Sequence, residues 1–180
     1  MADIETAVQF VLHQEDERLS GDVTTLPGDR GGPTRFGIAS AFHPELVAEH
    51  YFDVVDGEPV VPNDEALAIA EKVYAESYAA PLNLDEVEDQ NVANRMLSFA
   101  INESPREAIV ILQKALNSLG YWLAVDGVVG HHTLFAINST QPDALINALR
   151  AFEAQFYRDL VAARPEMKPL LQGLLNRANA

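Results

Sequence analysis

Helix start and stop signals recur through the chain from residue 64 onward, and they restrict its fold more than any other feature. Pro81 and Pro165 interrupt helical patterns, because proline lacks the N–H group that an α-helix needs. Ser104-Pro105-Arg106-Glu107 is a capping box with proline at the first helical position, which is a strong start signal. The expected helices cover residues 64–80, 91–103, 105 to Gly120, 142–163 and 166–177. The sequence therefore predicts a mainly α fold.

The first helix is expected from about Asp3 to Glu15, where apolar residues recur on one face. At 100° per residue, Glu15 falls about 20° from Ile4, within that apolar face, whereas Glu17 falls at about 220°. Desolvation on this face and the negative end of the helix dipole both favour the neutral carboxyl, so we expect a raised pKa for Glu15. A general acid needs such a pKa to protonate a leaving oxygen near neutral pH. The alternative is that Glu15 caps the helix end or pairs with an arginine.

Prolines and glycines crowd residues 19–37, where we expect a loop with a small β-hairpin. A polar pair on such a loop, facing the acid, would hold a water molecule or stabilise an oxocarbenium ion. Asp29 and Thr34 lie on this loop. The segment 54–64, with two prolines, is expected to be a second loop.

Composition excludes several other kinds of chemistry. The chain has no cysteine, so a thiol nucleophile and a zinc–thiolate site are excluded. Its five histidines do not show a metal-ligand spacing, and the glycines near residue 30 are not followed by the lysine of a phosphate loop. We therefore expect no metal and no cofactor.

The acidic charge lies almost entirely in the first half of the chain. Residues 1–90 carry 20 acidic and 4 basic side chains, whereas residues 91–180 carry 7 and 8, within a formal net charge of -15. Such a chain lacks the basic surface that binds phosphate backbones, so nucleic acid is not an expected partner. The N-terminus has no basic segment followed by an apolar run, and no signal peptide or stable membrane insertion is expected.

The stretch from Val11 to Ala39, "VLHQE…GDRGGPTRFGIA", resembles the N-terminal signature of the glycoside hydrolase family 108 lysozymes, which are N-acetylmuramidases. The family's essential acid corresponds to Glu15, and its loop aspartate and threonine correspond to Asp29 and Thr34. In the second half, "LSFAINESPREAIVILQKALN" and "VDGVVGHHTLFAIN" resemble the predicted peptidoglycan-binding segment that accompanies this family. The resemblance implies a lysozyme-like helical fold with a small β excursion near residues 19–37.

The resemblance also implies the reaction and its place. It implies cleavage of the β-1,4 bond between N-acetylmuramic acid and N-acetylglucosamine in peptidoglycan glycan strands, with residues 1–90 as the catalytic segment. Residues 91–180 would form a peptidoglycan-binding segment packed into the same globule. We expect a monomer, made in the cytoplasm and acting on the cell wall after release by a holin or another non-classical route.

Several candidate residues would contact the substrate. We expect Arg35 and Phe36, which lie within the N-terminal motif, and Tyr78 and Asn102 to bind it. Aromatic faces pack on sugar rings, and an asparagine amide can hydrogen-bond an acetamido group. The alternatives are a core position for Tyr78 and a structural role at a helix end for Asn102.

The chain departs from the family pattern in three places. Asp16-Glu17-Arg18 replaces the Gly-Gly-Tyr that follows the acid, and His131 stands where proline is usual. The loop between Glu15 and Asp29 is longer than in the family, so Asp22 is the substitute candidate if Asp29 is not the second carboxylate. These departures keep two alternatives open: a non-catalytic wall-binding or scaffold protein of the same fold, and a lytic transglycosylase.

Overall fold

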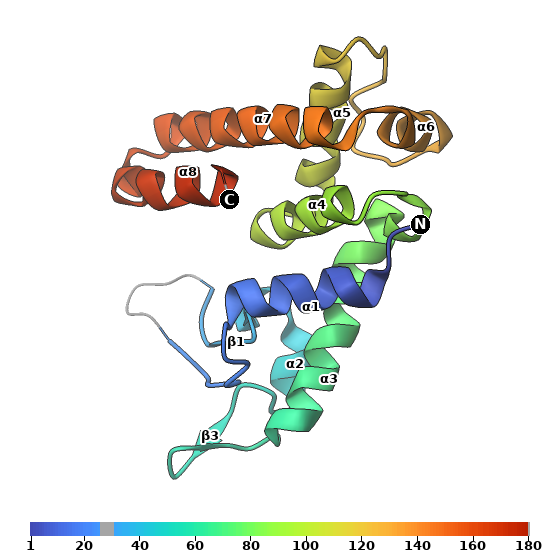
Figure 1. The fold of residues 1–180 in the computed structure, drawn as a ribbon. Helices are drawn as coiled ribbons and strands as arrows, with labels where there is room; N and C mark the ends of the chain where they lie inside the picture. The colour runs from blue at the N-terminus through green and yellow to red at the C-terminus, as the bar shows by residue number, and fades with distance from the viewer. Residues whose placement is uncertain (26–30, 180) are drawn as a thin grey trace. The chain divides into compact units, whose positions relative to one another are not determined.

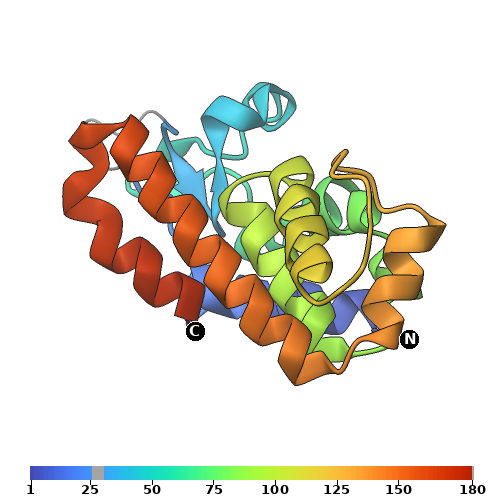
Figure 2. The ribbon, with the colours of Figure 1, turned by 90° about the horizontal axis from the view of Figure 1, so that it is seen from above.

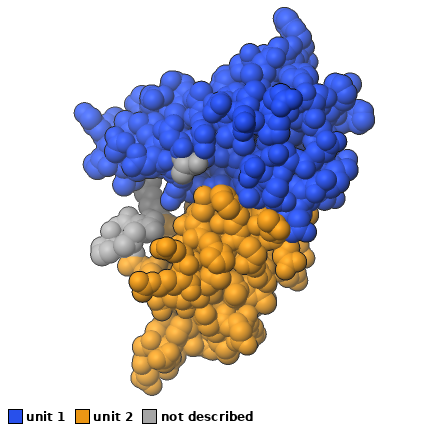
Figure 3. Space-filling model, viewed as in Figure 1, with its two compact units in different colours: residues 1–3, 78–180 blue, residues 4–77 orange. Residues whose placement is uncertain are grey.

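The computed structural model describes residues 1–25 and 31–179. The described residues are mainly helical with two short antiparallel strand pairs, which confirms the predicted fold class. Two compact units are distinguished in different colours in Figure 3: unit 1 contains residues 1–3 and 78–180, and unit 2 contains residues 4–77. None of the described helices combines the length and the apolar character that crossing a membrane requires.

Unit 2 is built on two crossing helices, α1 (Ile4–Glu15) and α3 (Asn63–Val73), as Figure 1 shows. The Gln9 side chain on α1 donates a hydrogen bond to Glu71 of α3, 2.6 Å from Nε2 to Oε1. The buried side chains of the two helices are Ala7, Val8, Val11, Leu12, Ala66 and Ala70. The predicted apolar face of the first helix is therefore confirmed.

A short hairpin in unit 2 joins β1 (Thr34–Arg35) to β2 (Ile38–Ala39). Its two turn residues, Phe36 and Gly37, have φ of 49° and 77°, which is the backbone of a type I′ hairpin turn. Thr24 forms an isolated antiparallel bridge to Thr34. The β structure expected near residues 19–37 therefore includes this bridge and the β1–β2 hairpin, which ends at Ala39.

The remaining parts of unit 2 are short. A 3-10 turn, η1 (Ser40–Phe42), leads into α2 (Pro44–Ala48). The segment predicted as a loop contains a second hairpin, β3 (Val54–Val55) and β4 (Glu58–Pro59), around the turn-forming pair Asp56-Gly57.

The helix expected over residues 64–80 changes its winding before Pro81. α3 continues into a π-helical turn, η2 (Tyr74–Ala79), and two 3-10 turns follow, η3 (Ala80–Leu82) and η4 (Leu84–Glu86). The boundary between the two units falls within η2. Isolated π-helical turns are rare and are frequently found at functional sites.

Unit 1 is a helical assembly. α4 (Gln90–Asn102), α5 (Pro105–Ser118) and α7 (Pro142–Ala163) pack against one another, and α8 (Leu171–Asn179) runs alongside α7 (Figure 2). α6 (His131–Ser139) packs on α5, and a 3-10 turn, η5 (Pro165–Leu170), precedes α8. The predicted helix start is confirmed, because Ser104 is the N-cap of α5 and its Oγ accepts from the backbone N–H of Glu107 at 3.1 Å.

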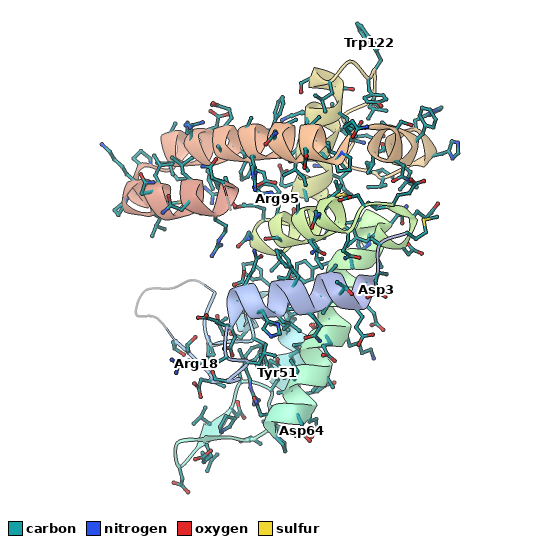
Figure 4. All side chains as sticks on the ribbon, viewed as in Figure 1. Asp3, Arg18, Tyr51, Asp64, Arg95 and Trp122 are labelled. Atoms are coloured by element: carbon teal, nitrogen blue, oxygen red, sulfur yellow. The ribbon has the colours of Figure 1, made fainter. Side chains whose placement is uncertain are left out.

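A buried ion pair ties three helices of unit 1 together. Arg95 of α4, labelled in Figure 4, forms a salt bridge with Glu153 of α7, with 3.2 Å between Nε and Oε1. The same guanidinium donates to the backbone oxygen of Ala178 on α8. Glu153 is only 2% exposed, so the loss of Arg95 would leave a buried charge without its partner.

Candidate active site

Glu15 is the last residue of α1, in unit 2. It is half-buried, whereas Glu17, two residues further on, is exposed. This is the orientation that the helical periodicity predicts, with Glu15 on the side of the apolar face and Glu17 turned to solvent. Glu15 is therefore, unlike Glu17, partly sheltered from solvent by the fold.

The stem of Glu15 lies on the turn of the β1–β2 hairpin. A Cβ atom built on Gly37 would lie 2.9 Å from both Cβ and Cγ of Glu15 and 2.5 Å from the Tyr74 hydroxyl. The Tyr74 hydroxyl donates to the backbone oxygen of Phe36 at 2.7 Å. Only glycine fits this close approach and the positive φ together, so Gly37, Tyr74 and the end of α1 form one packed arrangement around the Glu15 stem.

The segment after Glu15 is held by hydrogen bonds. Asp16 Oδ2 accepts from the backbone N–H of Gly21 at 2.9 Å and from the Ser20 hydroxyl at 3.2 Å. Partial burial acts to raise the pKa of Asp16, but these bonds and those from the backbone of Ser20 and Arg18 hold that pKa below its usual value. Asp16 is thus an ionised acceptor that closes the turn, in the place of the first glycine of the family's Gly-Gly-Tyr.

Arg35 was predicted to bind substrate, and the structure places it inside unit 2. Its side chain is 1% exposed and donates to the backbone oxygens of Gly21 at 2.8 Å, Val61 at 3.0 Å and Tyr51 at 3.3 Å. Burial lowers the pKa of its guanidinium, against the effects of Tyr51 and Asp22. These bonds join three chain segments, so Arg35 orders the loops around the hairpin.

Phe36, the neighbouring predicted substrate contact, is buried beneath the hairpin at a positive φ. Its ring lies 5.9 Å from Arg35 Cζ, and a Cβ on Gly21 would contact its ring edge. In this structure its contacts are therefore with the core of unit 2.

Three residues were predicted to position the attacking water: Thr34, Asp29 and its substitute Asp22. Thr34 is half-buried on β1, and its hydroxyl donates to the backbone oxygen of Gly32 at 3.3 Å, which leaves the oxygen lone pairs available to a water. Asp29 lies outside the described residues. Asp22 is exposed, and its backbone N–H lies 3.4 Å from the Ser20 hydroxyl oxygen that accepts from it.

The two remaining substrate candidates, Tyr78 and Asn102, belong to unit 1. Tyr78 is half-buried in η2. The Asn102 amide donates to the backbone oxygen of Ser98 at 2.7 Å and accepts from the Arg177 guanidinium on α8. This bonding fits the helix-end alternative for Asn102, because both ends of its amide already have partners within the unit.

Two carboxyls that the sequence patterns did not single out, Glu103 and Glu153, have a pKa that burial raises to about 7. Burial raises the pKa of Glu103 to about 7, and the charge of Glu107 adds to this effect, while Arg164 and Arg177 oppose it. Glu103 follows the last residue of α4, just before the capping box. Burial, the largest cause, and the two arginines, which are more than 60 residues away in the sequence, depend on how the helices pack, so no local pattern predicts the shift.

The described residues at the end of α1 offer carboxyl and hydroxyl groups and no metal-binding cluster. Among residues 1–25 and 31–179, no three or more histidine, aspartate or glutamate side chains are grouped so that they could hold a metal ion. The arrangement instead presents the half-buried Glu15 carboxyl at the end of α1, with its stem packed on a hairpin that bears the Thr34 hydroxyl. That geometry suits proton donation to a leaving oxygen and placement of a water.

Comparison with known proteins gives two family matches that together cover most of the chain. The family described as glycosyl hydrolase 108 matches residues 8–103, and the family described as a predicted peptidoglycan domain matches residues 107–179. The solved structure of SagA from Brucella abortus is similar, with a TM-score of 0.64 and 25% sequence identity over 97% of this chain and 92% of that chain. None of the curated proteins that were compared matches this chain.

Proposed function

Because the chain belongs to the glycosyl hydrolase 108 family, we propose that this peptidoglycan hydrolase uses Glu15 as its general acid. The bond cleaved is the β-1,4 bond between N-acetylmuramic acid and N-acetylglucosamine. The observation that carries this assignment is the packing of the Glu15 stem on Gly37, which fixes one half-buried carboxyl at the end of α1. A fixed carboxyl can protonate a glycosidic oxygen without a cost of reorganisation at each turnover.

The proposed reaction proceeds by direct attack of water. Protonated Glu15 gives its proton to the glycosidic oxygen, and the bond electrons remain on that oxygen as it leaves. The hydroxyl of a water adds to C1 of the muramic acid ring, and the second proton of the water passes to Asp29. Thr34, whose hydroxyl donates to Gly32, accepts a hydrogen bond from this water and orients it. Proton exchange with solvent restores both carboxyl groups.

We assign a different role to each half of the chain. Residues 1–90 carry the hydrolysis, and residues 91–180 bind the wall. Support comes from the order of the two family matches, residues 8–103 for the hydrolase and residues 107–179 for the peptidoglycan domain, although the hydrolase match extends 13 residues beyond residue 90.

Digestion of purified peptidoglycan sacculi tests the assignment of Glu15. Wild type, Glu15→Gln and Glu17→Gln are compared by release of reducing ends and by mass spectrometry of the products. The neighbouring exposed Glu17 provides a matched control, since the same change is made two residues away. We expect hydrated reducing ends from wild type and Glu17→Gln and none from folded Glu15→Gln. Full activity of Glu15→Gln would refute the assignment. Anhydro sugars among the products would show that the enzyme is a lytic transglycosylase and not a hydrolase.

A further inference from the structure

The one tryptophan of the chain, Trp122, lies in the segment between α5 and α6 of unit 1 and is 99% exposed. Figure 4 shows its ring projecting from this segment into solvent. Tryptophan has a large apolar surface and is on average a highly buried residue. Amphipathic aromatic rings of this kind are enriched where proteins bind partners.

The backbone that presents Trp122 is held by two amide side chains of α5. Asn117 Nδ2 donates to the backbone oxygen of Leu123 at 2.9 Å, and Asn117 Oδ1 accepts from the Leu123 N–H at 2.7 Å. Gln113, which is buried, donates to Val128 O and Asp126 Oδ1 and accepts from the N–H groups of Asp126 and Gly127, at 2.8–3.0 Å. A segment ordered in this way loses little conformational entropy when it binds a ligand.

A cavity of about 200 Å³ lies beside Trp122 and is bordered by His131, His132 and Thr133 at the start of α6. Its volume is below that of a pocket that encloses a drug-sized ligand, so it accommodates one group of a larger molecule. The cavity wall that these residues form combines aromatic and polar character.

The start of α6 offers hydrogen-bond donors to an anion. Gly130 is the N-cap residue and has no side chain to accept from the first N–H groups of the helix. The Thr133 side chain borders the cavity and is 4% exposed, and no hydrogen bond to its hydroxyl is formed by residues 1–25 and 31–179. A helix N-terminus favours negative charge, and a carboxylate accepts hydrogen bonds from both N–H and O–H groups.

The acidic residue among those that border the cavity, Asp126, forms hydrogen bonds within the segment between α5 and α6 and with α5. Asp126 Oδ1 accepts from Gln113 and, at 3.0 Å, from the backbone N–H of Val128, and these bonds hold the pKa of its exposed carboxyl below its usual value. The surface thus combines an aromatic face with a helix N-terminus whose first N–H groups have no side-chain cap. A ligand that matches both features has a sugar ring and a free carboxylate.

We propose that this surface binds a muropeptide, with a pyranose ring stacked on Trp122 and a stem-peptide carboxylate at the start of α6. The proposal rests on the proposed function in taking peptidoglycan as the ligand, but it needs no cleavage of the glycan. It assigns to named residues a second contact with the wall, in unit 1, in addition to the hydrolytic residues of unit 2.

Binding is measured on the full chain carrying Glu15→Gln, by isothermal titration with purified GlcNAc–MurNAc–tetrapeptide. Trp122→Ala is expected to weaken binding by at least about tenfold, because it removes on the order of 100 Å² of apolar contact. Phe135→Ala is the matched control, since Phe135 is a 65% exposed aromatic residue of α6 that does not border the cavity. An unchanged affinity in Trp122→Ala, or an equal loss in Phe135→Ala, overturns the proposal.

Thr133→Val tests the carboxylate half, because the change removes the hydroxyl and keeps the buried volume close to its original value. We expect weaker binding of the disaccharide–tetrapeptide and unchanged binding of chitotetraose, which has no carboxylate. Equal affinity of the Glu15→Gln chain for the two probes would contradict the proposal that the start of α6 binds a carboxylate. Residual hydrolysis by Glu15→Gln would count against the proposed catalytic acid alone, so the two failures are distinguishable.

Discussion

Substitution of Gly37 by alanine perturbs the position of Glu15 without altering the carboxyl itself. The added carbon would lie 2.9 Å from the Glu15 stem and 2.5 Å from the Tyr74 hydroxyl, at a backbone φ of 77°. A left-handed backbone costs alanine about 1–2 kcal/mol, and overpacking adds about 1–3 kcal/mol. The free energy of unfolding should therefore fall by roughly 2–5 kcal/mol, which lowers Tm by roughly 4–20 °C for a chain of this size.

Gly57→Ala is the control that separates the cost of a left-handed backbone from the cost of a steric clash. Gly57 has a φ of 87°, but no atom lies within 4 Å of a Cβ built there. The variant should therefore lose only about 1–2 kcal/mol and keep its activity. In Gly37→Ala the Glu15 stem must move by about 0.5 Å to restore normal contact distances, and we expect kcat on sacculi to fall by about tenfold or more.

The assay combines thermal unfolding followed by circular dichroism with initial rates measured well below both transitions. Tyr74→Phe removes the nearest atom that the new carbon would meet, so Gly37→Ala should cost less in that background. A Gly37→Ala variant with the kcat and the Tm of Gly57→Ala would refute the argument that this contact positions Glu15.

Arg35→Lys replaces a guanidinium that donates three hydrogen bonds with an ammonium group that does not match their geometry. The free energy of unfolding measured in urea should fall by about 2–4 kcal/mol. The same change at the exposed Arg18 should have little effect. Glu103, with its pKa raised to about 7, keeps a proton in the folded state that the unfolded chain releases above pH about 4.3, so stability should fall as pH rises from there to 7. Glu103→Gln should flatten this part of a Tm–pH curve, and an unchanged curve would contradict it. Asp29→Asn should lower kcat on sacculi by about 10²–10⁴-fold and Asp22→Asn should not; the reverse result would move the role to Asp22.

The parts of the fold that local patterns control were predictable. The apolar spacing in α1 and the N-cap at Ser104 depend on residues within one or two helical turns, and both are confirmed. The Asp56-Gly57 pair is a recognised hairpin signal, but the prolines around it favoured a loop. Helix periodicity also predicted that Glu15 and Glu17 would face different ways.

The parts that depend on distant contacts were not predictable. Arg35 lies in a motif beside the acid, yet its guanidinium bonds to carbonyls up to 26 residues away in the sequence, which no local pattern reveals. The π-helical winding at Tyr74 accompanies a hydrogen bond to Phe36, 38 residues earlier. Asn102 is bonded by Arg177 of α8, so its partner is set by the packing of the helices.

The most direct test of the account is the digestion of purified sacculi by Glu15→Gln and Glu17→Gln, two carboxyl-to-amide changes at neighbouring positions. With circular dichroism showing both variants folded, we expect Glu17→Gln to release products at the wild-type rate and Glu15→Gln to release none. Mass spectrometry should find N-acetylmuramic acid at the new reducing ends. Wild-type product release by Glu15→Gln, or equal losses in both variants, would contradict the claim that α1 and the hairpin hold one carboxyl for proton donation.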